Sequence, residues 1–400
     1  MSHRILFVTE SLFPLGPAEQ LLRLSSQLVK RDHQIIVAVL GQRTFEPTQW
    51  TDAGIEVHFL NGDDTTPLHN LRDGFFVTRE LRTLIRSVAP NIVHSWCGVS
   101  ELMTLLATEN LPLFKPLKKL RLISTELYLQ PEKRFVRQVV EKNLAQRVER
   151  MIVPHISVKN YLVENGYREP RIDIVPNSLA TSSLSASEMA AKRTAARQRT
   201  LSMLGLPETA LLAGTVAPLI HRSRLKDLIF ATNLLDCAFS EEWFAEHKPG
   251  AAVPDVHLLI IGKGTQKKQL KRFAILTEAK PQVHFLDHPD SPEEIIASLD
   301  FYWHSHLRDP LSGNLMAAMA HGIPAISVFG PGSEEIVRHQ ETGFAVNFGA
   351  RDEFARWTKY LIEQQDSGQQ LANQGQSFVQ ANFKESKMID GYVGVYDLTS

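Results

Sequence analysis

The stretch HSHLRDPLSGNLMAAMAHGIPAIS, residues 304–327, has the residue types and the order of an anion-binding site. A strand-like run ends at Asp309, and a glycine-containing turn then opens an apolar helix with almost no charge in its first turn. The first N–H groups of a helix have no partner within it, and the helix dipole favours negative charge there. We therefore predict that the backbone amides of Gly313, Asn314 and Leu315 bind a phosphate. The alternative is that Gly313 only caps the connection between sheet and helix.

The composition limits what that phosphate could belong to. The chain has 400 residues, of which 43% are hydrophobic, and its net charge is −1. This length favours two domains rather than one or three. The absence of a basic excess argues against a protein whose main task is to bind nucleic acid, so we expect a small-molecule partner.

Cysteine use and hydropathy indicate the compartment. Only two cysteines occur, Cys97 and Cys237, which gives neither a disulfide framework nor a cysteine-based metal site. The apolar run ILFVT near the N-terminus is too short for the core of a signal peptide, and no run of about 18 apolar residues could span a membrane. His304 and His306 share one face of a strand, but a third ligand is missing nearby in the sequence, so we expect no metal site. We expect a cytoplasmic protein.

Alternating strands and helices must position these residues. Apolar runs such as ILFVT, IIVAVL and NIVHS alternate with amphipathic segments in the first half, and LLAGTV, VHLLIIG and PAISVF continue the pattern in the second. Continuously apolar strands separated by helices are typical of a parallel sheet covered on both faces. We therefore predict two α/β halves, each a doubly wound parallel sheet, separated by the serine-rich and alanine-rich segment 180–204. Ligands of such folds bind at the carboxyl ends of the strands.

Motifs along nearly the whole chain follow the order found in a known family. They are GPAEQLLRLSSQL, PNIVHSW, IVPNSL, AGTVAPLIHRSRLKDLIFA, LLIIGKGTQKKQL, VHFLDHP and AAMAHGIPAISVFGPGSEEIVRHQETGFAV. In this order they resemble the GT-B fold glycosyltransferases, and within them the large retaining group called family 4. The resemblance implies two Rossmann-like domains facing a central cleft. The acceptor-side domain would cover residues 1–185, the nucleotide-sugar-binding domain residues 186–372, and a C-terminal helix in residues 373–400 would cross back to the first domain.

The resemblance implies transfer of a sugar from a UDP- or GDP-linked donor to a hydroxyl acceptor, with retention and without a metal or other cofactor. In the family, an arginine and a lysine hold the phosphates, and two glutamates hold the donor sugar and the ribose. Here Pro218 and Ser223 stand at the cation positions, and Asp309 and Ala317 at the glutamate positions. Asp309 is the candidate catalytic acid, whereas the alanine cannot accept a hydrogen bond from a ribose hydroxyl. A second hypothesis is therefore a catalytically degenerate relative that binds nucleotide or a partner without turnover.

Other residues fit the donor side of such a site. Arg222, Arg224 and Lys226 crowd the loop and helix start from which the usual cations are missing, so a shifted register could bring one or two of them to a phosphate. Alternatively, they lie on a solvated helix face. Gly262 and Gly264 match the glycine turn that follows a strand in the family, or they form a simple strand exit.

The first domain offers weaker candidates. GPAEQ resembles the family's GGAE loop, which assigns Gly16 and Glu19 to the donor phosphates, although Glu19 could equally be an acid favoured by the helix dipole. Glu126 lies near the position of an acceptor-side histidine in relatives and is a candidate general base, or else an exposed carboxylate at a strand end. The basic segment 115–137 is interpreted as a solvated surface, with a weak peripheral membrane contact as the alternative. The insertion at 239–255 indicates no function.

Overall fold

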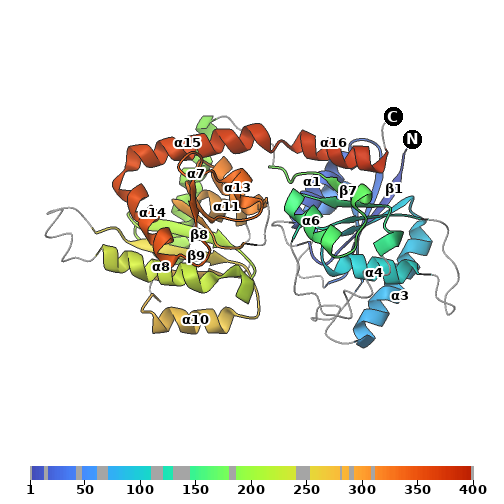
Figure 1. Ribbon diagram of the computed structural model, residues 1–400, viewed down its shortest axis with the longest axis horizontal. Coiled ribbons are helices and arrows are strands. Elements are labelled where there is room, and N and C mark those ends of the chain that lie inside the picture. The colour runs from blue at the N-terminus through green and yellow to red at the C-terminus, as the bar shows by residue number, and fades with distance from the viewer. Residues whose placement is uncertain are drawn as a thin grey trace. The chain divides into compact units, whose positions relative to one another are not determined.

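A computed structural model gives the structure of the chain (Figure 1). It describes residues 2–12, 17–41, 47–60, 71–109, 120–128, 145–179, 186–239, 253–279, 282–287, 292–307 and 311–397. The chain divides into two compact units. Unit 1 consists of residues 1–178 together with residues 385–400, and unit 2 consists of residues 179–384.

Unit 1 is built on a parallel sheet of seven strands in the order β3-β2-β1-β4-β5-β6-β7. The strands are β1 (Arg4–Thr9), β2 (Gln34–Val39), β3 (Glu56–Phe59), β4 (Ile92–Trp96), β5 (Arg121–Thr125), β6 (Arg150–Val153) and β7 (Ile172–Ile174). The helices are α1 (Pro17–Val29), α2 (Thr48–Asp52), α3 (Leu71–Val88), α4 (Val99–Thr108), α6 (Ile156–Glu164) and α16 (Glu385–Tyr396), with the short 3-10 helices η1 (Ala145–Arg147) and η2 (Glu169–Arg171).

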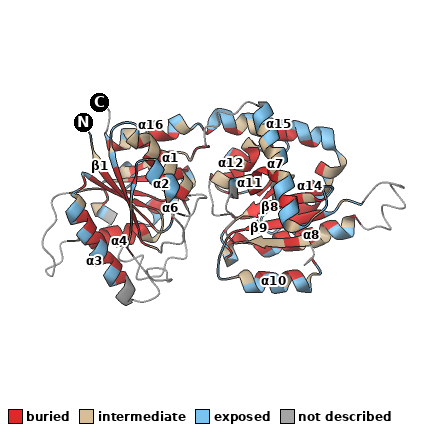
Figure 2. Cartoon of the chain, turned by 180° about the vertical axis from the view of Figure 1, so that it is seen from behind, coloured by how far each residue is buried: buried red, intermediate tan, exposed pale blue. Residues whose placement is uncertain are grey.

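Both faces of this sheet are buried, which explains why strands such as β1 and β2 are mostly apolar on both faces. In β1, Ile5 and Phe7 belong to a core cluster that includes side chains of α1 and α16, whereas Leu6 and Val8 belong to a cluster with α3 and α4. Successive side chains of a strand point to opposite faces, so helices cover the sheet on both sides. Figure 2 shows the strands as a buried layer and the exposed residues on the outer sides of the helices.

Unit 2 repeats the architecture with a parallel sheet of six strands in the order β10-β9-β8-β11-β12-β13. The strands are β8 (Leu211–Val216), β9 (Val256–Ile261), β10 (Val283–Leu286), β11 (Phe301–His304), β12 (Ala325–Val328) and β13 (Phe344–Val346). The helices are α7 (Ala186–Leu204), η3 (His221–Ser223), α8 (Leu225–Ala238), α10 (Lys267–Leu276), α11 (Pro292–Ala297), α12 (Gly313–Ala320), α13 (Ser333–Ile336), α14 (Arg351–Glu363) and α15 (Gln365–Asn382). The prediction of two Rossmann-like α/β domains with parallel sheets is confirmed. Within the described ranges, no helix is long and apolar enough to cross a membrane.

The last helix, α16, belongs to unit 1 although all of unit 2 precedes it. Its buried side chains join the core beside β4 and β5; they are Met388, Ile389, Tyr392 and Tyr396. The imidazole of His94 in β4 lies 2.6 Å from the Tyr396 hydroxyl through Nδ1 and 2.8 Å from Thr125 Oγ1 through Nε2. Burial lowers the pKa of His94 to about 3, so the ring that links the sheet to α16 is neutral at ordinary pH.

Candidate functional site

The predicted phosphate-binding site lies at the start of α12, just beyond the carboxyl end of β11. Ser312 precedes the helix, and its side chain makes no capping hydrogen bond. The first helical bond runs from the Met316 N–H to the Ser312 carbonyl, at 3.1 Å. The N–H groups of Gly313, Asn314 and Leu315 make no hydrogen bond to any residue that the structure describes. These three donors therefore share one helix end and are available to a ligand.

Helix α15 holds the other end of α12 in place. The Gln376 side chain donates to the Ala320 carbonyl, the last residue of α12, at 2.7 Å. Gly375 lets the two elements approach, because a Cβ there would lie 2.5 Å from the Thr342 carbonyl oxygen and 3.1 Å from the end of the Met319 side chain. A larger residue at this position would push α15 away from α12.

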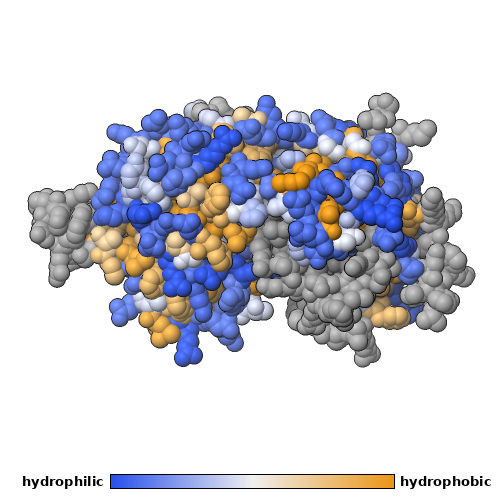
Figure 3. Space-filling view, in the orientation of Figure 1, coloured by the Kyte–Doolittle hydropathy of each residue, from blue (hydrophilic) through white to orange (hydrophobic). Residues whose placement is uncertain are grey.

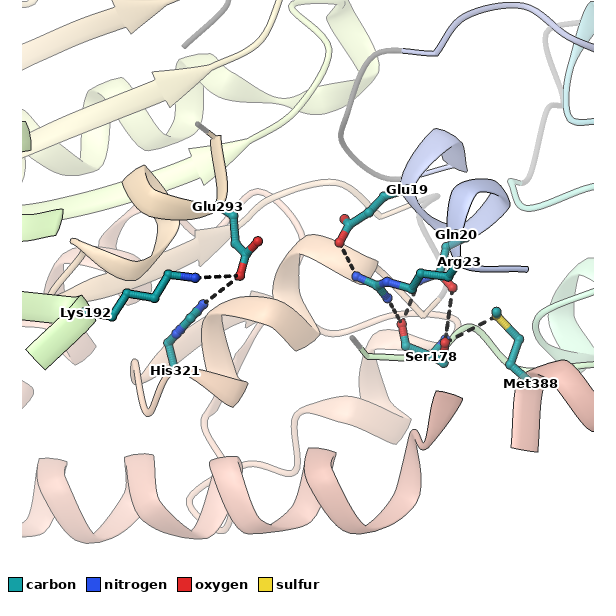
Figure 4. A network of polar contacts seen from close by, with 8 residues as sticks. All are labelled: Glu19, Gln20, Arg23, Ser178, Lys192, Glu293, His321 and Met388. Atoms are coloured by element: carbon teal, nitrogen blue, oxygen red, sulfur yellow. Dashed lines mark hydrogen bonds and ion pairs between the residues drawn. The ribbon is translucent and has the colours of Figure 1, made fainter. Parts of the chain in front are cut away.

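A polar contact with α11 fixes His321, the residue that follows α12 (Figure 4). The Glu293 carboxylate lies 3.9 Å from His321 Nε2 and 3.6 Å from the ammonium of Lys192 in α7. Burial lowers the pKa of His321, and the Glu293 charge opposes that shift. Helix α12, which carries the predicted phosphate-binding site, thus contacts α15 on one side, and His321 after it lies near α11 on another.

The loop after β8 is braced at Pro218 and Ser223, the two positions where the resemblance implies phosphate-binding cations. The Ser223 hydroxyl donates to the Pro218 carbonyl at 2.6 Å. The Ser305 hydroxyl, just beyond β11, donates to the Ser223 carbonyl, also at 2.6 Å. Pro218 and Ser223 therefore serve the shape of the loop, and they tie it to the strand that leads to α12.

Arg222 lies in the same loop, inside η3, and is half-buried. Its Nε is buried and has no hydrogen-bond partner in the part of the chain that the structure describes, and its guanidinium forms no ion pair there. A buried charged donor without a partner is costly, since it has lost its water without replacing it. Such a group is typical of a site whose ligand supplies the missing acceptor.

Of the two neighbouring cations, Arg224 is held in an ion pair and Lys226 is exposed. Arg224 adopts a left-handed backbone with φ of 55°, its Nε donates to the buried Asp227 carboxylate at 2.7 Å, and its guanidinium lies 5.0 Å from the centre of the Phe348 ring. Arg351 donates to the other oxygen of Asp227 at 2.8 Å. Lys226 is exposed, with its ammonium 5.4 Å from the Phe273 ring centre, which fits the solvated-face alternative.

The glycine turn after β9 packs against the loop after β8. Gly262 has φ of 144°, and a Cβ there would lie 2.2 Å from the Ala217 carbonyl oxygen. At Gly264 a Cβ would lie 2.4 Å from the carbonyl oxygen of Leu219, whose N–H donates to the Lys263 carbonyl at 2.8 Å. The two glycines thus allow a close backbone approach that shapes the loop carrying Arg222.

In unit 1, Glu19 lies in the first turn of α1 and forms an ion pair with Arg23. The same guanidinium donates to the Ser178 carbonyl at 2.7 Å, and the Gln20 side chain donates to that carbonyl at 2.7 Å (Figure 4). The Ser178 hydroxyl lies 3.4 Å from the sulfur of Met388 in α16. Glu19 therefore belongs to a network that holds the backbone at Ser178, the last residue of the first segment of unit 1.

Glu126 directly follows β5 and is only 2% exposed. The alternative of an exposed carboxylate at a strand end is therefore wrong. Its backbone N–H donates to the Ile152 carbonyl at 3.0 Å, and its carboxylate accepts the Tyr128 N–H at 3.3 Å. Sequence reasoning could not show the burial, because charged residues at strand ends are usually solvated.

Three residues that follow strands of unit 1, at the same carboxyl edge as Glu126, were not predicted as site residues; they are Glu10, Cys97 and Gly98. Glu10 follows β1, and its carboxylate accepts the Val99 N–H at the start of α4. Gly98 permits this, since a Cβ there would lie 2.1 Å from Glu10 Oε1. Burial and the nearby charge of Glu126 raise the pKa of the Cys97 thiol. The position of Glu10 at a strand end was the signal that could have identified it.

Some predicted residues lie outside the described part of the chain. These are Asp309 and Gly16, together with most of the basic segment 115–137 and of the insertion 239–255. Ala317 is described and is half-buried on α12, one turn beyond the free amides. Within the described ranges, no group of three histidine, cysteine, aspartate or glutamate side chains could hold a metal ion.

Comparison with protein families gives a match for each half of the chain. Residues 204–378 match the family described as Glycosyl transferases group 1, and residues 16–183 match Glycosyltransferase Family 4. The chain belongs to the group 1 glycosyltransferases. The group 1 match contains Arg222, both turn glycines and all of α12. The candidate donor-side residues of unit 2 therefore lie inside the matched residues.

Individual relatives are similar to this chain in sequence or in structure. The lipopolysaccharide core biosynthesis glycosyltransferase LpsE of Rhizobium meliloti (strain 1021) is 24% identical over 143 residues, which are 36% of this chain and 42% of LpsE. The match thus spans less than half of that relative. The solved structure of Anabaena HepE in complex with UDP and glucose has a TM-score of 0.76 at 16% identity and covers 99% of both chains. Sucrose-phosphate synthase from Thermosynechococcus elongatus has a TM-score of 0.75 at 14% identity, covering 99% of this chain and 98% of the synthase. These likenesses confirm the predicted GT-B fold.

Proposed function

We propose that this protein transfers a sugar from a nucleoside diphosphate donor to a hydroxyl acceptor, with retention and without a metal ion. The observation that carries the proposal is Arg222, whose buried Nε lacks a partner among the described residues. It lies on the loop after β8, and the neighbouring strand β11 leads to the free amides of α12. A cation and three N–H dipoles at adjacent strand ends suit a diphosphate.

The chemistry follows from where charge develops. The bond between the anomeric carbon of the sugar and a phosphate oxygen breaks, and that carbon bonds to the acceptor oxygen. Negative charge grows on the departing diphosphate, so donors fixed around it stabilise the transition state more than the ground state. We assign this role to Arg222 and to the amides of Gly313, Asn314 and Leu315.

Two carboxylates complete the proposed assignment. The acceptor hydroxyl loses its proton as it attacks, and we assign Glu126 as the base, since it is a buried acid at the end of β5 in the acceptor-side unit. We assign Asp309 to the donor sugar, as the resemblance implies. Ala317 leaves the ribose without the carboxylate that relatives supply, so we expect weaker nucleotide binding than in a typical relative.

Donor, acceptor and compartment are proposed at a coarser level. UDP- and GDP-linked sugars are both candidates, and the structure of HepE in complex with UDP and glucose favours UDP for the first test. The name of LpsE, a lipopolysaccharide core biosynthesis glycosyltransferase, favours a saccharide hydroxyl as the acceptor. Cys97 and Cys237 are free, which suits a reducing compartment, and we propose the cytoplasm.

The test compares Arg222→Ala with Lys226→Ala, a matched control from the first turn of α8, the helix that follows the loop. We expect Arg222→Ala to weaken UDP binding by about 10- to 100-fold, the effect of losing a hydrogen bond to a charged group. Lys226→Ala should bind UDP as the unmodified protein does. Isothermal titration calorimetry measures both affinities. Equal UDP affinity of the Arg222→Ala variant and the unmodified protein would contradict the proposal.

Binding without turnover is the second candidate function. The structural roles of Pro218 and Ser223 favour it, because these positions brace the loop instead of supplying charge. Hydrolysis of a panel of sugar nucleotides separates the two functions, since water can replace a missing acceptor. Release of free sugar that depends on Arg222 supports transfer. Tight, Arg222-dependent UDP binding with no hydrolysis of any donor supports the binding-only relative.

A further inference from the structure

Helix α10 of unit 2 carries an exposed stripe of cations and aliphatic side chains. Its members occur at the spacing i, i+3, i+4, i+7 and i+8, which places them on one helical face. They are Lys268, Lys271, Arg272, Ile275 and Leu276, and all are exposed. Leu270 and Ala274 on the opposite side are buried in the core of unit 2. We call the exposed stripe the outer face of α10.

Lys271 lies 5.9 Å from the centre of the Phe285 ring, but the charges of this face are not placed to stabilise the helix itself. The first turn of α10 is the positive end of the helix dipole, yet Lys267 and Lys268 occupy it. Lys268 and Arg272 are like charges four residues apart, which repel each other, and α10 contains no acid to offset them. Lys267, at the flank, pairs with Asp287. Within the described part of the chain, the three cations of the outer face form no ion pair.

The aliphatic pair extends the basic stripe toward the end of the helix. Ile275 is 55% exposed and Leu276 is 71% exposed. Single exposed aliphatic residues are common in proteins, but an adjacent pair beside three cations offers both the apolar area and the positive charge by which a helix binds an anionic membrane surface. Figure 3 shows hydrophobic and hydrophilic atoms side by side along the edge of the unit where Figure 1 places α10.

We propose that the outer face of α10 docks on an anionic phospholipid surface. Lys268, Lys271 and Arg272 would meet the headgroups, while Ile275 and Leu276 would enter the boundary with the acyl chains. Nucleic acid fits less well, because the face has no aromatic side chain for base stacking and the whole chain has a net charge of −1. The outer face of α10 is a different stretch of the sequence from segment 115–137, and the proposal does not depend on the proposed donor site.

The test measures co-sedimentation of the full chain with two kinds of vesicle, phosphatidylcholine alone and phosphatidylcholine mixed with phosphatidylglycerol. We expect binding to the mixed vesicles only, and weaker binding as salt is raised. Each cation near the surface contributes about a fivefold change in partitioning, so Lys268→Gln/Lys271→Gln/Arg272→Gln should weaken it by on the order of 100-fold. Ile275→Ser/Leu276→Ser should abolish the fraction of binding that survives high salt.

A matched control removes three exposed lysines elsewhere, as Lys30→Gln/Lys384→Gln/Lys387→Gln. It should bind the mixed vesicles like the unmodified protein, and far-UV circular dichroism should show that all variants are folded. The proposal is overturned if the unmodified protein does not prefer mixed vesicles, or if the control loses as much binding as the α10 variant. Binding of polyglutamate, but not of vesicles, through α10 would instead identify an acidic protein as the partner.

Discussion

Protonation of His94 should weaken unit 1 in mild acid. The ring is fully buried between β4, β5 and α16, and its two nitrogens lie within hydrogen-bond distance of hydroxyl groups, not carboxylates. A neutral imidazole satisfies both contacts, since each hydroxyl can donate or accept. An imidazolium would place a positive charge among aromatic side chains with no carboxylate partner among the described residues, which is why burial lowers its pKa.

The size of the effect follows from the pKa values of the folded and unfolded chains. The pKa is 6.5 in the reference state and about 3 in the folded protein. Between these values the unfolded chain binds a proton that the native state excludes, so the contribution is complete above pH 6.5 and is lost as the pH falls toward 3. The loss amounts to about 2 kcal/mol at pH 5 and approaches about 5 kcal/mol in stronger acid.

Hydrogen exchange of the β4 and β5 amides, followed by mass spectrometry and corrected for intrinsic rates, measures this loss. Between about pH 7.5 and pH 5, the unmodified protein should lose about 2 kcal/mol more than His94→Gln, equal to about a 30-fold change in the opening equilibrium. Other histidines with lowered pKa, such as His284 and His321, contribute equally to both proteins and cancel in the difference. The same pH dependence in both proteins would refute the reasoning.

Three further perturbations test particular contacts. Gly262→Ala should destabilise unit 2 by on the order of 2 to 4 kcal/mol in urea denaturation, because the new Cβ would clash with a carbonyl oxygen and the backbone conformation disfavours side chains. As a control, Gly205→Ala should cost about 1 kcal/mol, because there is open space around Gly205. Ala317→Glu should tighten UDP binding about tenfold in calorimetry if the ribose lies beside it, and an unchanged affinity would exclude that placement. Tyr396→Phe should cost about 1 to 3 kcal/mol, because His94 Nδ1 loses its partner, and faster exchange of the β4 amides would report it.

Much of the fold could be predicted from the sequence, because strands buried on both faces form short, nearly continuous runs of apolar residues. Runs such as those of β1 and β9 are mostly apolar on both faces because helices cover both sides of the sheet, and their alternation with helical segments favours a parallel arrangement. Domain bounds were harder. The sequence placed the first bound at residue 185 and the returning helix from residue 373, whereas the compact units divide after Ser178 and Lys384. Which helix face belongs to which core depends on contacts between distant segments.

The site was less predictable than the fold, because its side chains are selected by contacts that spacing does not encode. Arg222, Arg224 and Lys226 look equivalent in the sequence. Arg224 is engaged by Asp227, which is also held by Arg351 from more than a hundred residues away, and only the structure shows this. The sequence also could not predict that the Ser223 hydroxyl donates to the Pro218 carbonyl and thereby braces the loop. Backbone amides at the start of α12 were predictable, since they require only a strand, a turn and a helix.

The place of α16 in the chain has a consequence for synthesis on the ribosome. The core of unit 1 lacks its Tyr392 and Tyr396 side chains until α16 has been made, after about 200 residues of unit 2. At 5 to 20 residues per second, this delay lasts roughly 10 to 40 s. During that time the surface beside β4 that α16 will cover, including His94, stays open to water and to chaperones. Unit 2 can therefore fold first, and a nascent chain arrested near its end would expose an apolar face of its N-terminal sheet.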